Sequence, residues 1–301
     1  MKKRCFIALV ILLALLLSAC ASGDGAAREA YETLNEYYAD QPVAPNEYLR
    51  ALAWACSGEG YDGWQTECYA AAAEWLDSCG GVLSNTKSTE YSAAILTLTA
   101  AGYDARDIAG YDLTAALFDA SFVTKQGING AIFALLALDS GAYPVPEGLR
   151  EELVEAILSR RLSDGGFAFS GERADPDMTA MALTALAAYT DRADVAAAVE
   201  QALETLSALQ GEDGGYASFG TVNAESSAQV VLALAALGYE QEDERFVKNG
   251  VSALDALLSY RLSDGTFAHE AGGAFNALAT YQAYAALTAA AGDENLFTLA
   301  K

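Results

Sequence analysis

Residues 223–237 read NAESSAQVVLALAAL, in which a glutamate stands just ahead of an almost wholly apolar run. Comparable runs recur along the chain at separations of 43, 39, 48, 48 and 53 residues. They begin near Glu47, Glu90, Asn129, Asp177, Glu225 and Leu278. Because one such unit cannot bury its apolar surface alone, a repeat of this length indicates stacked helix pairs, propeller blades or a closed helical toroid.

The stretches between these runs have one apolar and one polar face. Residues 149–161, 194–210 and 244–260 repeat apolar residues at intervals of three and four, which is typical of outer helices with one face in water. The alternate runs are apolar on nearly every side, as inner helices packed on both faces should be. Outer helices are therefore predicted at 26–39, 65–78, 113–120 and the three stretches above, with inner helices at 47–56, 90–101, 129–138 and from about 177, 225 and 279.

Six outer and inner helices in alternation predict an all-α fold, an (α/α)6 toroid. No stretch rich in Pro, Gly and Ser divides the repeats, so residues 26–301 are predicted to form a single domain. An open superhelix is the alternative, but neither end of the repeats carries a polar capping pair. The sequence therefore favours closure.

Three later repeats share a turn with the pattern Asp-Gly-Gly/Thr-aromatic, at 164–167, 213–216 and 264–267. Each turn follows an outer helix, where a glycine takes the left-handed conformation that ends the helix and the aromatic residue docks into the core. We interpret these turns as structural; aromatic residues lining a ligand site are the alternative.

The N-terminus reads as an export signal, because basic residues 2–4 precede an apolar run, 6–17, that is short for a membrane span. Residues 17–20, Leu-Ser-Ala-Cys, resemble a bacterial lipobox, which implies removal of residues 1–19 and a lipid on Cys20. An ordinary signal peptide with a chance cysteine is the alternative. Residues 20–25 then form the lipidated end and a flexible tether. The protein is predicted to be extracytoplasmic and anchored by its lipid to the bacterial cell membrane.

The chain is strongly acidic, with a formal net charge of −24. Nucleic acids and anionic lipid surfaces both require a positive surface, so the composition excludes them as partners and favours neutral or cationic ligands. Cys56, Cys68 and Cys79 lie beyond the predicted signal and lipidation site. An oxidising compartment permits a Cys56–Cys68 disulfide across the predicted turn between two helices, and three buried thiols are the alternative.

Several segments resemble the terpenoid cyclase and protein prenyltransferase superfamily, which also contains the toroids of transcobalamin and intrinsic factor. Residues 210–216, QGEDGGY, are similar to the Q-x3-G-x-W repeat of squalene cyclases, and residues 175–180, DPDMTA, resemble their D-x-D-D-T-A motif with Met178 in place of the last Asp. Residues 89–92, 126–130, 138–141 and 223–229 look like exported bacterial proteins with prenyltransferase and squalene oxidase repeats. The resemblance spans roughly residues 45–290 and implies the toroid fold; toroids of this kind host both enzymes and binding proteins.

The resemblance implies a possible enzyme, a terpene or squalene cyclase in which Asp177 is the proton donor and Asp175 its neighbour. Met178 removes the third carboxylate of the motif, and those cyclases build their cavity from two domains. The zinc site of the prenyltransferases cannot be assembled, since no cysteine follows Cys79 and His269 is the one histidine, so no metal or other cofactor is predicted. A polysaccharide-active (α/α)6 enzyme stays open, because carboxylate pairs are available.

The sequence favours binding over catalysis. Inner-helix N-termini of a toroid emerge at one end, where their polar side chains would ring a mouth; the alternative is that these residues only cap their helices. Such a mouth around an apolar funnel suits a bulky amphipathic small molecule, such as a corrinoid, or another surface protein. The predicted ligand-binding residues are Glu90, Tyr91, Gln126, Asn129, Asp177, Glu225, Gln229, Thr280 and Gln282. His269 is predicted to be a solvated turn residue.

Overall fold

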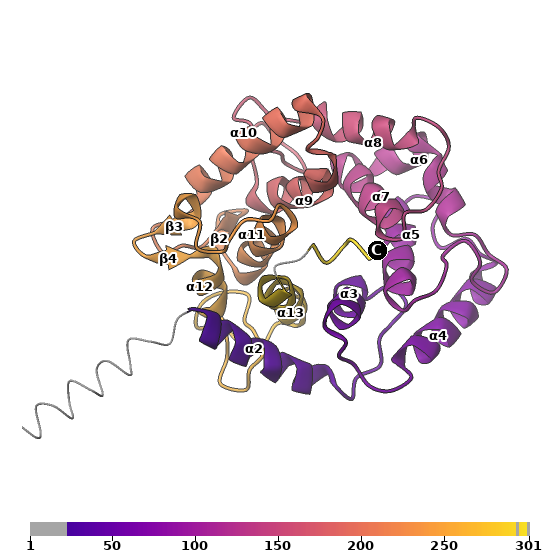
Figure 1. The fold of residues 1–301 in the computed structure, drawn as a ribbon, viewed down its shortest axis with the longest axis horizontal. Coiled ribbons are helices and arrows are strands. Elements are labelled where there is room, and N and C mark those ends of the chain that lie inside the picture. Colours follow the sequence, from indigo (N-terminus) through magenta and orange to yellow (C-terminus); the bar gives the residue numbers. More distant parts are fainter. Residues whose placement is uncertain (1–22, 293–294, 300–301) are drawn as a thin grey trace, which may run out of the picture.

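The computed structural model describes residues 23–292 and 295–299. Their helices alternate between an inner and an outer ring around one axis, so the predicted (α/α)6 toroid is confirmed (Figure 1). The inner ring contains α3 (Tyr48–Ser57), α5 (Ser88–Ala100), α7 (Ile128–Ser140), α9 (Pro176–Leu186), α11 (Ala224–Ala236) and α13 (Ala277–Gly292). The outer ring contains α2 (Gly23–Tyr38), α4 (Trp64–Cys79), α6 (Ala120–Val123), α8 (Leu149–Leu158), α10 (Ala193–Leu209) and α12 (Ala253–Leu258). The predicted signal peptide and Cys20 lie outside the described residues.

Two outer helices differ most from the prediction. Within the helix predicted at 113–120, residues 114–118 form a 3-10 helix, η1 (Thr114–Phe118); α6 begins at Ala120, and η2 (Thr124–Gln126) follows it. In place of the first half of the helix predicted at 244–260, η4 (Glu244–Phe246) leads into a hairpin of β3 (Val247–Lys248) and β4 (Val251–Ser252). The turn of this hairpin is Asn249-Gly250, both with positive φ, a pair that strongly favours two-residue hairpins and overrides the apolar periodicity.

The shared Asp-Gly-Gly/Thr-aromatic turns are structural, as predicted. Phe167, Tyr216 and Phe267 are fully buried. In the first and third of these turns a threonine of the next inner helix holds the backbone of the aromatic residue. The Thr179 hydroxyl accepts from the Phe167 N–H and donates to the Phe167 carbonyl oxygen, both at 3.0 Å. The Thr280 hydroxyl does the same with Phe267, at 3.0 and 3.3 Å. The turn therefore fixes the point at which the chain leaves an outer helix and enters the next inner helix.

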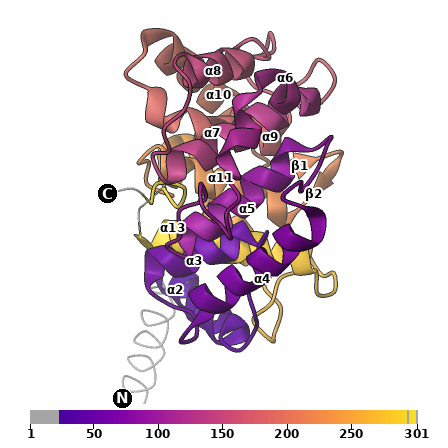
Figure 2. The ribbon, with the colours of Figure 1, turned by 90° about the vertical axis from the view of Figure 1, so that its right-hand side faces the viewer.

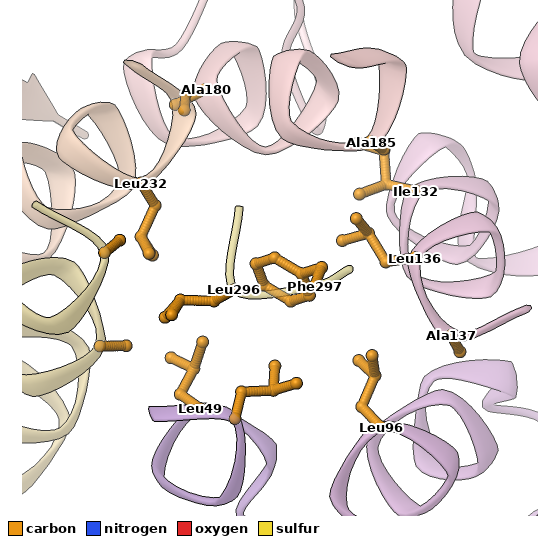
Figure 3. Close-up of a cluster of buried hydrophobic side chains, with 14 of the residues drawn as sticks. Leu49, Leu96, Ile132, Leu136, Ala137, Ala180, Ala185, Leu232, Leu296 and Phe297 are labelled. Carbon is orange, nitrogen blue, oxygen red and sulfur yellow. The ribbon is translucent and has the colours of Figure 1, made fainter. Parts of the chain in front are cut away.

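The C-terminal segment fills the centre of the toroid. Figure 3 shows Leu296 and Phe297 in the middle of the ring of inner helices, surrounded by side chains such as Leu49 and Leu136. Phe297 is 7% exposed, and its ring lies 6.4 Å from that of Tyr48. The cavity that remains beside Phe297 measures about 10 Å³, room for about one water molecule. The centre of the barrel is therefore a packed core.

The structure does not contain the predicted Cys56–Cys68 disulfide. Cys68 is a buried thiol on α4, and burial raises its pKa to about 11. Cys56 lies at the far end of α3, where its sulfur is 3.9 Å from the carbonyl oxygen of Leu296. Cys68 thus belongs to an outer helix, whereas Cys56 lies at the end of an inner helix and near Leu296. Within residues 23–292 and 295–299, no helix combines the length and apolar character that a membrane crossing requires.

Candidate binding site at one end of the toroid

The two ends of the toroid differ in surface chemistry. Each outer helix passes into the following inner helix at one end, which we call the mouth: the connections 39–47, 80–87, 124–127, 159–175, 210–223 and 259–276 with the adjoining helix turns. In Figure 2 the β1–β2 hairpin (Ala217–Ser218 and Thr221–Val222) protrudes on the side of the mouth, and residues 295–299 lie towards the opposite side, where Leu299 contacts the end of α7. The exposed large apolar side chains of the described residues all belong to the mouth: Tyr37, Val82, Phe169, Leu209, Phe219, Val222, Phe275 and Leu278.

This one-sided distribution is the strongest indication of function on the surface. Phe219, at the tip of the β1–β2 hairpin, is 95% exposed, and Leu278, in the first turn of α13, is 55% exposed. Scattered single apolar residues on a surface need no explanation, but here all the large exposed ones of the described residues lie at the same end. The mouth is therefore the part of the described surface that is best suited to contact a ligand or partner.

An open groove of about 440 Å³ lies in the mouth between α2, α3 and the start of α13. Its walls are mainly aromatic, with rings from Tyr37, Tyr38, Tyr48, Phe275 and Tyr281. Glu47 also lines it, but its carboxylate is neutralised by Arg50 at 2.5 Å, and the buried Arg50 guanidinium lies 5.0 Å from the Tyr38 ring centre. The groove can accept an apolar or aromatic body.

A second part of the mouth carries carboxylates that no Lys or Arg neutralises. Asp175 is the N-cap of α9: its Oδ1 accepts from the Met178 N–H at 3.0 Å, and its Oδ2 accepts from the Ser218 hydroxyl at 2.5 Å. Asp177 follows in the first turn of α9, and Glu225 stands in the first turn of the adjacent α11. We call Asp175, Asp177 and Glu225 the carboxylate cluster. Among the ion pairs of the described residues, none joins a Lys or Arg to this cluster.

The carboxyl of Asp177 is electrostatically unfavourable when ionised. Burial raises its pKa from 3.8 to about 6, and the negative charges of Asp175 and Glu225 act in the same direction. The hydroxyls of Ser226 and Ser218 lower the pKa, but less than burial raises it. The Ser226 hydroxyl is near enough to Asp177 to have this effect, but neither Asp177 Oδ1 nor Ser226 Oγ, both buried, makes a hydrogen bond of good geometry. The site thus holds unused acceptor capacity beside an incompletely stabilised charge.

His269 meets the cluster from the loop that precedes α13. Its Nδ1 lies 2.8 Å from Glu225 Oε2, while the Glu225 side chain is largely buried and the His269 side chain is 42% exposed. The carbonyl oxygen of His269 also accepts from the Ala224 N–H at 3.0 Å, which ties the loop to the start of α11. His269 is therefore a partly exposed turn residue, as predicted from the sequence, and it also contacts Glu225, which was not predicted.

Helical spacing places some of the nine predicted ligand-binding residues near the axis of the toroid. Asn129, Asp177 and Glu225 each stand one turn before a side chain that lines the small central cavity, namely Phe133, Met181 and Gln229. Gln229 and Gln282 lie deeper and bond each other at 2.9 Å. Glu90 is in the first turn of α5 and is half-buried.

Three residues of the predicted ring have structural partners instead. Gln126 accepts from the Thr89 N–H at 3.0 Å and from the Ser88 hydroxyl, so it satisfies the N-terminus of α5. The Tyr91 hydroxyl accepts from the Leu83 N–H at 3.1 Å, and Thr280 is the fully buried partner of Phe267. A polar residue near a helix start cannot be assigned to the axis or to the neighbouring layer from sequence, because one residue of register turns it by about 100°.

Asp177 and Glu225 lie in the first turns of α9 and α11, where the helix dipole favours negative charge as expected, but the prediction that their side chains accept from the free N–H groups is wrong. The side chains that accept from the first turns are Asp175 in α9, Asn223 in α11, where Oδ1 accepts from the Ser226 N–H at 2.8 Å, and Asn276 before α13. Each cap stands two residues ahead of the first-turn position that the repeat pattern emphasised. Asp177 and Glu225 therefore have no capping function that would account for their burial.

Sequence reasoning missed Ser218, Ser226 and the pairing of His269 with Glu225. Ser218 enters through the β1–β2 hairpin, for which the signal was the Phe219-Gly220 turn. The exposed aromatic residues of the mouth were also missed, since sequence does not show which phenylalanines leave the core. No group of His, Cys, Asp and Glu among the described residues is arranged to hold a metal ion.

The comparisons with known proteins agree with this architecture. Residues 118–300, more than half of the chain, match the model of the prenyltransferase alpha-alpha toroid domain. A search of curated proteins found no match. The solved structure of the type II terpene cyclase MstE_Y157F from Scytonema, in its apo form, is similar with a TM-score of 0.59 and 13% identity, over 90% of this chain and 97% of that chain. The match covers nearly the whole of both chains, so the two are similar in length. Since identity is low, this likeness shows the fold, and the family match shows that the chain belongs to the prenyltransferase alpha-alpha toroid family.

Proposed function

We propose that this protein is a lipid-anchored, extracytoplasmic binding protein that holds an amphipathic small molecule at the mouth of its toroid without transforming it. The observation that carries the proposal is the gathering of exposed apolar side chains at one end of the toroid, around a groove and a set of uncompensated carboxylates. Apolar walls with a few convergent polar groups are typical of small-molecule sites.

The packed centre of the barrel supports binding over cyclisation. A cyclase acting through Asp177 must enclose a large hydrocarbon around the acid, whereas Leu296 and Phe297 occupy the centre and leave about 10 Å³. The segment that contains them enters from the end opposite the mouth, where the Leu299 N–H donates to the carbonyl of Ser140 at 3.2 Å. Leu296 and Phe297 would therefore prevent a ligand at the mouth from entering the centre of the barrel.

The proposed lipid anchor would leave the mouth accessible. A lipid on Cys20 would stand three residues before Gly23, the first residue of α2. Since α2 is an outer helix, its N-terminus lies at the end of the toroid opposite the mouth. Anchoring there would direct the mouth away from the membrane and towards ligands outside the cell.

A second candidate, acid-initiated cyclisation through Asp177, is favoured by one observation. The pKa of Asp177 is raised to about 6, which would keep part of the carboxyl protonated near neutral pH, as a proton donor requires. The full centre of the barrel opposes this candidate, and displacement of residues 295–299 would be needed to make room for a substrate.

Native mass spectrometry of the form starting at Ala21, with a panel of corrinoids, isoprenoids and polyprenyl diphosphates, tests the proposal. We expect a one-to-one complex that the double substitution Phe275→Ala/Leu278→Ala weakens by roughly thirty- to several-hundredfold, because each truncation removes about 1–2 kcal/mol of apolar contact. Val82→Ala, an apolar truncation in the mouth but outside the groove, is the control and should bind normally.

Two results would contradict the proposal. Turnover of an isoprenoid that Asp177→Asn abolishes would establish the cyclase instead. Failure of the whole panel and of simple neutral and amine amphiphiles to bind would favour a protein of the cell surface as the partner of the mouth.

A further inference from the structure

We propose that the ligand carries a primary ammonium group, which the Asp177 carboxylate binds in the carboxylate cluster while the apolar body of the ligand lies across the start of α13 and into the groove. This inference rests on the proposed function, since it concerns the same mouth. It narrows the ligand from amphipathic molecules in general to amphipathic amines.

Charge is the first reason. Asp175, Asp177 and Glu225 come together from two adjacent inner helices, and the basic residues in the described ion pairs bind carboxylates elsewhere, except for His269 on Glu225. Buried charges are normally paired, because an unpaired charge in a poorly solvated place is costly. A ligand cation would supply the missing partner, and an anionic ligand such as a diphosphate would be repelled.

Unused hydrogen-bond acceptors are the second reason. Ser226 is fully buried on α11, and its hydroxyl lies close enough to Asp177 to lower the pKa of that carboxyl; yet neither Ser226 Oγ nor Asp177 Oδ1 makes a hydrogen bond of good geometry. An ammonium offers three N–H donors together with a positive charge, so it satisfies both needs at once. A quaternary ammonium supplies charge without donors, and an alcohol supplies one donor without charge.

The third reason is the apolar surface next to the cluster. α11 packs against α13, where Gln229 and Gln282 join the two helices, and α13 begins with the exposed Leu278. Neighbouring inner helices lie about 8–10 Å apart, so an alkyl chain of moderate length that starts at α11 reaches Leu278 and Phe275. From there the groove of about 440 Å³ continues towards α3.

The affinity of this site for an ammonium ligand should depend on pH. An ammonium binds the ionised form of Asp177, whose pKa of about 6 means that about a tenth of the carboxyl is ionised at pH 5. Affinity should therefore fall by about tenfold between pH 7.5 and pH 5. The other titratable groups that face Asp177 are Asp175 and Glu225; His269 faces Glu225. Protonation of any of them removes negative charge or adds positive charge, so all act in the same direction.

Isothermal titration calorimetry with octylammonium tests the inference, with 1-octanol and octyltrimethylammonium as matched ligands. We expect octylammonium to bind at least tenfold more tightly than either at pH 7.5. Asp177→Asn should remove this preference and its pH dependence, and Glu225→Gln should weaken binding of octylammonium by a smaller factor. Asp191→Asn, which removes one exposed carboxylate at the opposite end of the toroid, should change neither. Circular dichroism at the same pH values confirms that each variant is folded.

The outcomes separate the two proposals. If octanol binds as tightly as octylammonium, or if Asp177→Asn and Glu225→Gln both leave octylammonium binding unchanged, the ammonium site is refuted. The proposed function would survive in that case provided Phe275→Ala/Leu278→Ala still weakens the binding of octanol. If neither these ligands nor the wider panel binds at all, both proposals fail.

Discussion

Replacing Asp177 by Asn is expected to stabilise the folded protein at neutral pH. The folded state raises the pKa of this carboxyl from 3.8 to about 6, so between these values the folded protein binds more protons than the unfolded chain. Stability contributed by the group is then greatest below pH 3.8, falls as the pH rises through about 6, and stays low above it. The full difference corresponds to about 3 kcal/mol.

The neutral amide of Asn occupies the same volume and carries no charge, so Asp177→Asn should recover up to about 3 kcal/mol at pH 8 and about half of that at pH 5. Urea denaturation at the two pH values, followed by circular dichroism, measures both differences. Asn223→Ala is the matched comparison on the neighbouring helix, because it removes an uncharged cap that bonds the Ser226 N–H at 2.8 Å. It should cost about 1 kcal/mol at either pH. The reasoning is refuted if Asp177→Asn is less stable than the wild type at pH 8, or if its gain is the same at pH 5 and pH 8.

Two further substitutions test the packing of the toroid. Phe297→Ala should lower the free energy of unfolding by about 3–5 kcal/mol and open an apolar cavity at the barrel centre, which urea denaturation and xenon binding would detect. The control, Thr298→Ala at an exposed position, should have little effect. Equal stability of both variants would show that the segment does not fill the core. Gly130→Ala should lower the free energy of unfolding by about 1–3 kcal/mol in thermal and urea denaturation, because the added Cβ would lie 2.0 Å from the carbonyl oxygen of Val123. The control, Gly25→Ala, should be neutral or stabilising, because nothing lies within 4 Å of its added Cβ. A neutral Gly130→Ala would mean that α6 is not packed against α7 as described.

The candidate site was only partly accessible to sequence reasoning. The repeat pattern pointed to Asp177 and Glu225 because an acidic residue just ahead of an apolar run is conspicuous, and their place facing the axis follows from helical periodicity. Gln126 and Thr280, added to the predicted site as neutral groups near the helix starts, bond neighbouring segments instead, because sequence does not show which layer such a side chain faces. His269 lies 44 residues from Glu225 in the chain, so only the tertiary fold brings the two together.

The sequence by itself determined the architecture of this protein. Six apolar runs alternating with amphipathic stretches can bury their surface only as two concentric rings of helices, and the Asp-Gly-Gly/Thr-aromatic turns fix where one ring passes to the other. Only the tertiary structure decided that Leu296 and Phe297 fill the centre, that the exposed aromatic residues share one end, and that three carboxylates meet there without a Lys or Arg partner. Periodicity encodes which face of a helix is buried. Contacts between segments distant in the chain depend on how the ring closes, and no local pattern records them.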